Sequence, residues 1–209
     1  MKWLKKRMSL TLLLLLVFSL GGCSSEYAKS EDIKLTPARW SADGSFWGIE
    51  YSEDEGGVLL TNTSTSHAKV EVIAKFYDDD RNYIDEDSKS LTLRANGSWF
   101  VFFDKDDDVA KIEYSVTTDE PFWDVVSLDD IEIEYEDEKV IVKNKSKTGT
   151  EACSIQFVYY KNGKIVDVVT GTVNDGYVPA NEKVAEEISF DTSVRYDEYK
   201  VNIYCLHEK

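Results

Sequence analysis

The chain has 209 residues, of which 42% are hydrophobic and 12% aromatic, and its 24 Lys and Arg against 40 Asp and Glu give a formal net charge of −16. Such an acidic surface repels phosphate backbones and argues against nucleic-acid partners, and the aromatic content and periodic apolar runs exclude a disordered acidic tail. The length allows one large domain or two small ones, each able to bury a core.

Residues 1–22 have the three parts of an export signal. A basic start, MKWLKKRM, is followed by the apolar run LTLLLLLVFSL at residues 10–20 and by two glycines. The run is shorter than the roughly 17 to 25 residues that a membrane-spanning helix needs. We therefore expect an N-terminal signal helix that is removed. Its four basic residues leave with it, so 20 basic residues remain against 40 acidic ones, a net charge of −20. The alternative is an uncleaved helix followed by an incidental cysteine.

The end of this segment, Leu20-Gly21-Gly22-Cys23, resembles the bacterial lipobox, in which a small residue precedes a cysteine that receives a thioether-linked diacylglycerol before cleavage on its amino side. The resemblance implies that Cys23 is lipidated and becomes the first mature residue. Two or more acyl chains bind a bilayer stably, because each buried methylene contributes about 0.8 kcal/mol. We therefore expect membrane lipid as one partner and a location on the extracytoplasmic face of a bacterial membrane.

Residues 23–40 contain small and charged residues, one Pro and no sustained period. We expect this stretch to be a lipidated tether that lets a folded part stand away from the membrane. Residues 33–35 are the one part of it whose pattern also fits a strand.

Two copies of one strand-rich pattern organise the rest of the chain. Residues 58–85 read VLLTNTSTSHAKVEVIAKFYDDDRNYID, and residues 140–167 read VIVKNKSKTGTEACSIQFVYYKNGKIVD. Alternating apolar residues indicate half-buried strands, and the turn Asn162-Gly163 is typical of a tight hairpin. We therefore expect an all-β chain with two tandem β-sandwich domains, residues 41–119 and 120–209. Strands are expected at residues 46–51, 58–61, 70–76, 83–84, 89–94, 98–103 and 111–116, and then at 131–135, 139–143, 152–160, 164–172, 184–190 and 200–205.

The segments Ala-Lys-Phe-Tyr-Asp at residues 74–78 and Phe-Val-Tyr-Tyr-Lys at residues 157–161 resemble the FxLYD signature of bacterial extracellular immunoglobulin-like domains. Ala74 departs from its leading Phe, and Tyr159 and Lys161 depart from its Leu and Asp. The resemblance implies small immunoglobulin-like sandwiches that serve as modules on secreted or surface-attached proteins, with no shared catalytic residues.

Two cysteines fall on expected core-facing positions of the second copy. Cys153 aligns with Val70, and Cys205 is expected where Val116 lies in the first copy. A disulfide between them is chemically permitted outside the cytoplasm and would stabilise a small domain by about 2 to 4 kcal/mol. The alternative is two reduced thiols that pack as small apolar residues.

The acidic runs, such as residues 78–80 and 104–108, suggest calcium binding, but a calcium loop starting at Asp104 would need Gly and Glu where Val109 and Ser115 stand. We expect solvated turns and no metal or cofactor. His67 and His207 lie in no nucleophile or zinc motif, and paired carboxylates are expected by accident among 40 acids. The chain is therefore not expected to be an enzyme.

The run Trp99-Phe100-Val101-Phe102-Phe103 is apolar on both faces of its strand. Something must cover the second face: the tether, a loop or the other repeat, or else a partner. Our hypothesis is that Trp99, Phe100 and Phe102 lie near an interface.

Together these features predict a lipid-anchored lipoprotein that acts as a non-catalytic binding or structural module, with an envelope protein or glycan as its unidentified partner. The alternative is an accessory or sensor subunit of an envelope enzyme or transporter complex.

Overall fold

The computed structural model describes residues 27–40, 55–104, 108–121, 130–136, 139–186, 192 and 194–207. In this part of the chain the fold is all-β, which confirms the predicted class. The strands form four antiparallel sheets of three strands each, and two short 3-10 turns, Ser30–Asp32 and Asn174–Gly176, accompany them. None of the helices in those ranges is long and apolar enough to cross a bilayer.

The first half of the molecule contains two of the sheets. One has the order β1-β2-β5 and the other the order β4-β3-β6. The bounds are β1 (Ile33–Trp40), β2 (Glu55–Asn62), β3 (Ala68–Tyr77), β4 (Tyr83–Leu93), β5 (Ser98–Phe103) and β6 (Lys111–Asp119). Alternation decides which side chains enter the core between these sheets: along β3, Val70, Val72, Ala74 and Phe76 are buried.

The second half repeats this arrangement. Its sheets have the orders β11-β8-β7 and β10-β9-β12. The bounds are β7 (Ile131–Glu136), β8 (Lys139–Asn144), β9 (Thr150–Lys161), β10 (Lys164–Thr172), β11 (Lys183–Glu186) and β12 (Glu198–His207). The hairpin between β9 and β10 turns at Asn162 and Gly163, both with positive φ, as the Asn-Gly pair predicts. Residues of both sheets form one buried cluster around Ile155 and Phe157.

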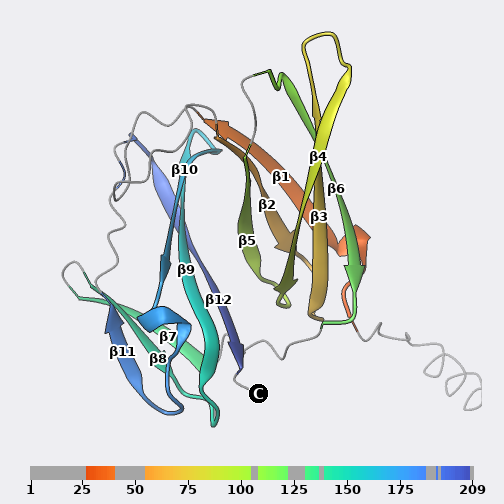
Figure 1. Ribbon diagram of the computed structural model, residues 1–209. Helices are drawn as coiled ribbons and strands as arrows, with labels where there is room; N and C mark the ends of the chain where they lie inside the picture. The colour runs from red at the N-terminus through yellow and green to blue at the C-terminus, as the bar shows by residue number, and fades with distance from the viewer. Residues whose placement is uncertain are drawn as a thin grey trace, which may run out of the picture.

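The four sheets stack as four layers (Figure 1). The sheet β1-β2-β5 is the second layer and β10-β9-β12 the third, and a separate buried cluster lies between them. Strand β9 is therefore buried on both faces from Ile155 to Tyr160, because one face meets its own core and the other meets the first half.

The repeat extends to fine structure. Asn62 and Asn144 are both buried, and each side-chain amide donates to the carbonyl of the residue four positions later, Ser66 or Thr148, at 2.8 Å. Each hairpin after the central strand also contains a register shift, beside Ile84 in β4 and beside Val166 in β10. A β-bulge is a specific feature of a strand and not a defect, so its presence at the same position in both halves supports the repeat.

The structure corrects the expected tether at residues 23–40. Residues 33–40 form β1 and pair with β2 over its whole length, and Ala28 is already buried in the first core. Residues 33–35 had the pattern of a strand, but the polar residues in the rest of β1 concealed its full length. An edge strand tolerates them, because one of its sides is free of pairing. The expected strands at 83–84 and 89–94 are one continuous strand, β4. The strand expected at 46–51, the signal helix and Cys23 lie outside the described residues.

Candidate functional site

The layer between the two halves is the main feature that the fold adds to the sequence pattern. From the first half it takes Ala38 of β1, Leu59 of β2 and Phe100 of β5. From the second half it takes side chains on β9 and β10, namely Val158, Tyr160, Ile165 and Val168. Each fully buried side chain of this kind contributes about 1.5 to 3 kcal/mol, so the layer holds the two halves together by apolar burial.

The bulge in β10 explains how two of these residues reach the same layer. Ile165 pairs with Tyr160 and Val168 pairs with Val158, because the register shifts between Ile165 and Asp167. Without the extra residue, positions 165 and 168 would point to opposite faces of the sheet. In the first half, the residue equivalent to Ile165 is Tyr83, which is 55% exposed. The bulge therefore faces solvent in the first half of the molecule, whereas the equivalent bulge in the second half packs against the first half.

A buried polar contact fixes the register of the two halves. Gln156 of β9 is 1% exposed. Its side-chain oxygen accepts the N–H of Phe100 at 2.7 Å, and its amide nitrogen donates to the carbonyl of Phe100 at 2.9 Å. Strand β5 is the edge of its sheet, so these backbone groups have no strand on that side. The Gln156 amide satisfies both of them as a further strand would.

The three residues predicted to lie near an interface are all found beside the second half. Phe100 is 1% exposed and belongs to the layer between the halves, while Phe102 is half-buried against the same cluster. Trp99 lies with its ring 5.5 Å from that of Tyr204 on β12. The cover for the second face is thus the other repeat, one of the alternatives considered above.

Sequence reasoning missed the partners of these aromatic residues. Residues 155–160, Ile-Gln-Phe-Val-Tyr-Tyr, are apolar on both faces in the same way as residues 99–103. The signal was therefore present. Gln156 obscured it, because a polar residue in an alternating strand is normally assigned to the solvent face.

Cys153 and Cys205 form a disulfide between the adjacent strands β9 and β12, with 4.1 Å between their Cα atoms. They are 0% and 2% exposed. The expected equivalence of Cys205 with Val116 is wrong. Cys153 corresponds to Val70, and Val70 pairs with Thr118, whereas Val116 pairs with Val72. The residue equivalent to Cys205 is therefore Thr118. The register shift between Leu206 and His207 makes Glu151 an extra residue of β9, which lies before Cys153 and is already included in the alignment of Cys153 with Val70.

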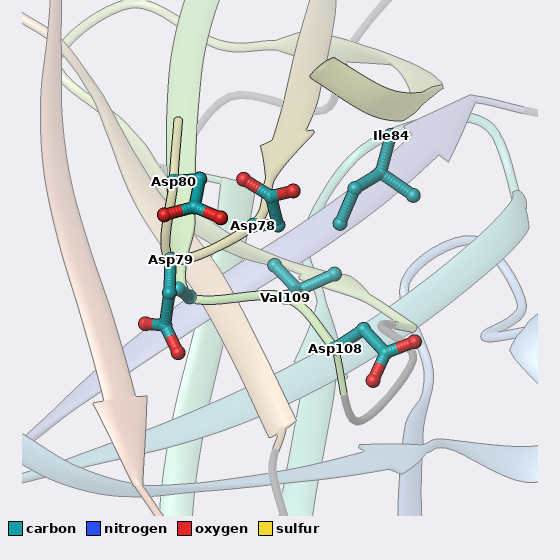
Figure 2. Close-up of a pocket in the computed structure, with 7 residues that line it drawn as sticks. Asp78, Asp79, Asp80, Ile84, Asp108 and Val109 are labelled. Atoms are coloured by element: carbon teal, nitrogen blue, oxygen red, sulfur yellow. The ribbon is translucent and has the colours of Figure 1, made fainter. Parts of the chain in front are cut away.

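An acidic hollow lies at the tip of the β3–β4 hairpin, lined by Asp78, Asp79, Asp80, Ile84, Asp108, Val109 and Ala110. Figure 2 shows that the labelled carboxyl groups do not converge on one point. Asn82 donates to Asp78 from both its backbone and its side chain, and these hydrogen bonds lower the pKa of that carboxyl. Across the described residues, no group of three or more ligating side chains is placed to hold a metal ion. The hollow therefore has the character of a capped turn.

Both histidines make contacts that hold loops. The ring Nδ1 of His67 accepts the N–H of Ala95 at 3.0 Å, and that of His207 lies 2.6 Å from the hydroxyl of Thr148. They lie in different halves of the molecule, at the ends of β-strands, and each joins two chain segments.

Arg94 is an unusual buried cation. The residue is 9% exposed, and its Nε has no hydrogen-bond partner. Burial lowers the pKa of its guanidinium to about 10. The ion pairs seen in the described ranges involve other residues. Burial of a guanidinium whose Nε makes no hydrogen bond costs free energy, so Arg94 is expected to destabilise the fold.

Comparison with known proteins adds no relative. No protein-family model matches the chain, and no curated protein matches it in sequence.

Proposed function

We propose that this chain is a bacterial lipoprotein, held on the extracytoplasmic face of a membrane through acylated Cys23, that serves as a non-catalytic binding or structural module. Its two halves would be immunoglobulin-like domains of the FxLYD kind, with the boundary near residue 120. The partner would be an envelope protein or a glycan, because the excess of acidic residues disfavours nucleic acid.

One observation carries the proposal: the two sandwich-like halves share a buried layer with a hydrogen-bonded register, from Phe100 to Gln156. A flexible pair of domains would leave this layer exposed to water. A stacked pair is instead a single stiff body, suited to holding a binding surface at a defined place relative to an anchor. Apolar burial combined with paired polar groups gives such an arrangement one geometry.

Two experiments test the parts of this proposal. The full-length chain, expressed in a bacterium, should yield a mature product that starts at Cys23 and carries acyl mass, and Cys23→Ser should yield a product without acyl mass that keeps residues 1–22, because acylation precedes cleavage. A mature product that starts elsewhere, or an unmodified Cys23, would contradict the anchor.

The stiff body is tested on the non-lipidated chain from residue 24. Small-angle scattering should fit one compact particle, and Phe100→Asp should convert it to an ensemble of separated halves, because a buried charge disfavours the layer. Wild-type scattering that already requires flexibly linked halves would contradict the structural part.

A further inference from the structure

We propose that the end of the first half formed by the loops at residues 62–67 and 94–97 lies against the membrane surface, with the acidic hairpin tip pointing away from it. The inference rests on the lipidation of Cys23 proposed above, and it names the surface of this chain that faces the lipid.

The buried structure begins very close to the anchor. Ala28 is 0% exposed, and its N–H donates to the carbonyl of His67 at 3.0 Å. The ring of Tyr27 packs against the first core. Five Cα–Cα steps separate Cys23 from Ala28, and a fully extended chain covers at most about 17 Å in that number of steps. The lipid can therefore be no further than this from the place where Ala28 is held.

Hydrogen bonds tie the loops of this end to the segment that follows the anchor. The carbonyl of Asp32 accepts both the N–H and the hydroxyl of Thr63, each at 2.9 Å. The second loop is bound to the first, since Asn96 donates its N–H to the carbonyl of Ser64 at 3.0 Å. The anchored segment and the two loops thus form one end of the molecule.

The acidic hollow lies at the opposite end of the same sheet. Strand β3 has ten residues, from Ala68 beside the first loop to Tyr77 beside the hollow, and ten residues of strand span about 30 Å. Figure 1 shows the β3–β4 hairpin projecting from the body at the end away from the start of β3. The carboxyl groups of Asp78, Asp79, Asp80 and Asp108 are therefore several Debye lengths from the anchored end.

Charge favours the same orientation. Bacterial and other membranes carry anionic lipids whose surface potential repels carboxylates within about a Debye length of the headgroups. Turning the acidic tip away from the lipid removes that repulsion. At the anchored end, exposed Lys29 lies beside Glu31 and Asp32 of the 3-10 turn Ser30–Asp32, so the electrostatic preference comes from the distance of the acidic tip and not from a basic patch. A lipid surface is the occupant that the short covalent connection to Cys23 requires.

The test places one fluorophore at each end of the lipidated full chain. Thr65→Cys lies in the first loop and Asp80→Cys in the hairpin turn, and both positions are exposed. With Cys23 acylated and Cys153 bonded to Cys205, the introduced thiol is the single free one. The chain is reconstituted in phosphatidylcholine–phosphatidylglycerol vesicles that contain a lipid with a nitroxide on its headgroup, a quencher that acts at short range.

We expect the label at position 65 to lose most of its fluorescence and the label at position 80 to lose little. Equal losses, or a greater loss at position 80, would overturn the orientation. A matched control inserts about 20 Gly and Ser residues after Ser25, which gives the anchor a flexible reach of about 25 Å and should reduce the difference between the two labels. A mature chain that does not float with vesicles would instead show that the anchor itself is wrong.

Discussion

The side-chain amide of Gln156 forms two hydrogen bonds with the backbone of Phe100, one through its oxygen at 2.7 Å and one through its nitrogen at 2.9 Å. These residues are 56 positions apart and belong to different halves of the chain. The pair joins the edge of one sheet to the face of another, so a single side chain acts where a neighbouring strand would otherwise be needed.

Replacing this amide tests how strongly the two halves depend on each other. Gln156→Leu should lower the free energy of unfolding by about 2 to 4 kcal/mol, because it leaves a buried N–H and a buried carbonyl of Phe100 unsatisfied. Urea unfolding followed by tryptophan fluorescence measures the change. Glu151→Leu on the exposed face of the same strand is the matched control and should shift the value by less than about 0.5 kcal/mol. Equal effects of the two variants would show that the contact contributes nothing.

Gly57 leaves the space into which the Phe100 ring packs. A Cβ at this position would collide with the ring carbon Cε1 of Phe100 and with the carbonyl of Val101. Gly57→Ala should therefore destabilise the fold by about 1 to 3 kcal/mol through overpacking. Gly56→Ala is the control: its Cβ would meet the flexible end of Ile112 at 3.2 Å, so a smaller loss is expected in the same thermal melts. A neutral Gly57→Ala would mean that Phe100 can leave its place freely.

The disulfide between Cys153 and Cys205 closes a loop with a sequence separation of 52 residues. Loop-closure entropy for that length corresponds to about 4 kcal/mol. The double variant Cys153→Val and Cys205→Thr, which copies the pair Val70 and Thr118 of the first half, should lower the melting temperature, and reductant should then have no further effect. In the unmodified native chain the bond should resist mild reductant, since both sulfurs are buried. Two thiols that titrate in the native state would contradict the bridge.

Removal of the buried charge at Arg94 should stabilise the chain. The pKa of Arg94 in the folded state is about 10, which lies below its pKa in the unfolded state. The unfolded state therefore binds the proton more tightly than the folded state does. The charged form therefore opposes folding at neutral pH, and this opposition fades only as the pH rises above about 10. Arg94→Met keeps the apolar stem and should raise the free energy of unfolding by about 1 to 3 kcal/mol.

Two further variants separate charge from packing at this position. Arg94→Ala loses the stem that lies over Gly97 and should gain less stability than Arg94→Met. Arg195→Met removes an exposed charge and should change stability by less than about 0.5 kcal/mol. If Arg94→Met is strongly destabilising in urea titrations, the guanidinium has a partner that stabilises it.

Asn62 and Asn144, which occupy equivalent positions in the two halves, are structural residues, and the exposed Asn96 is their control. Asn144 donates to the carbonyls of Thr148 and Val178 and accepts the N–H of Ser146. Asn144→Asp should cost about 3 kcal/mol or more, because a buried carboxylate can donate to neither carbonyl. Asn96 is exposed and has a φ of 53°, so Asn96→Gly should be neutral or slightly stabilising. Calorimetry measures the stability of both variants. Equal losses of stability for Asn144→Asp and Asn96→Gly would show that the buried hydrogen bonds are unimportant.

Local pattern predicted most of the strands. Alternation along β3 and the Asn-Gly turn before β10 each depend on a few neighbouring residues, so the chain itself specifies them. Only residues 33–35 of β1 fitted a strand pattern, because the rest of its sequence carries charged and Pro residues, which an edge strand tolerates. The site residues were also predicted only in part. Trp99, Phe100 and Phe102 indicated a second buried face, but no neighbouring residue identified what covers it.

The sequence by itself determined that this protein is an acidic, all-β chain built on one pattern used twice, because side-chain alternation and turn chemistry act over a few residues. Only the tertiary structure decided that Phe100 meets Gln156, that Cys153 lies opposite Cys205, and that the two halves stack through one shared layer. Such contacts join residues tens of positions apart, and their pairing depends on which faces remain apolar after each half has folded, a quantity that no local pattern contains.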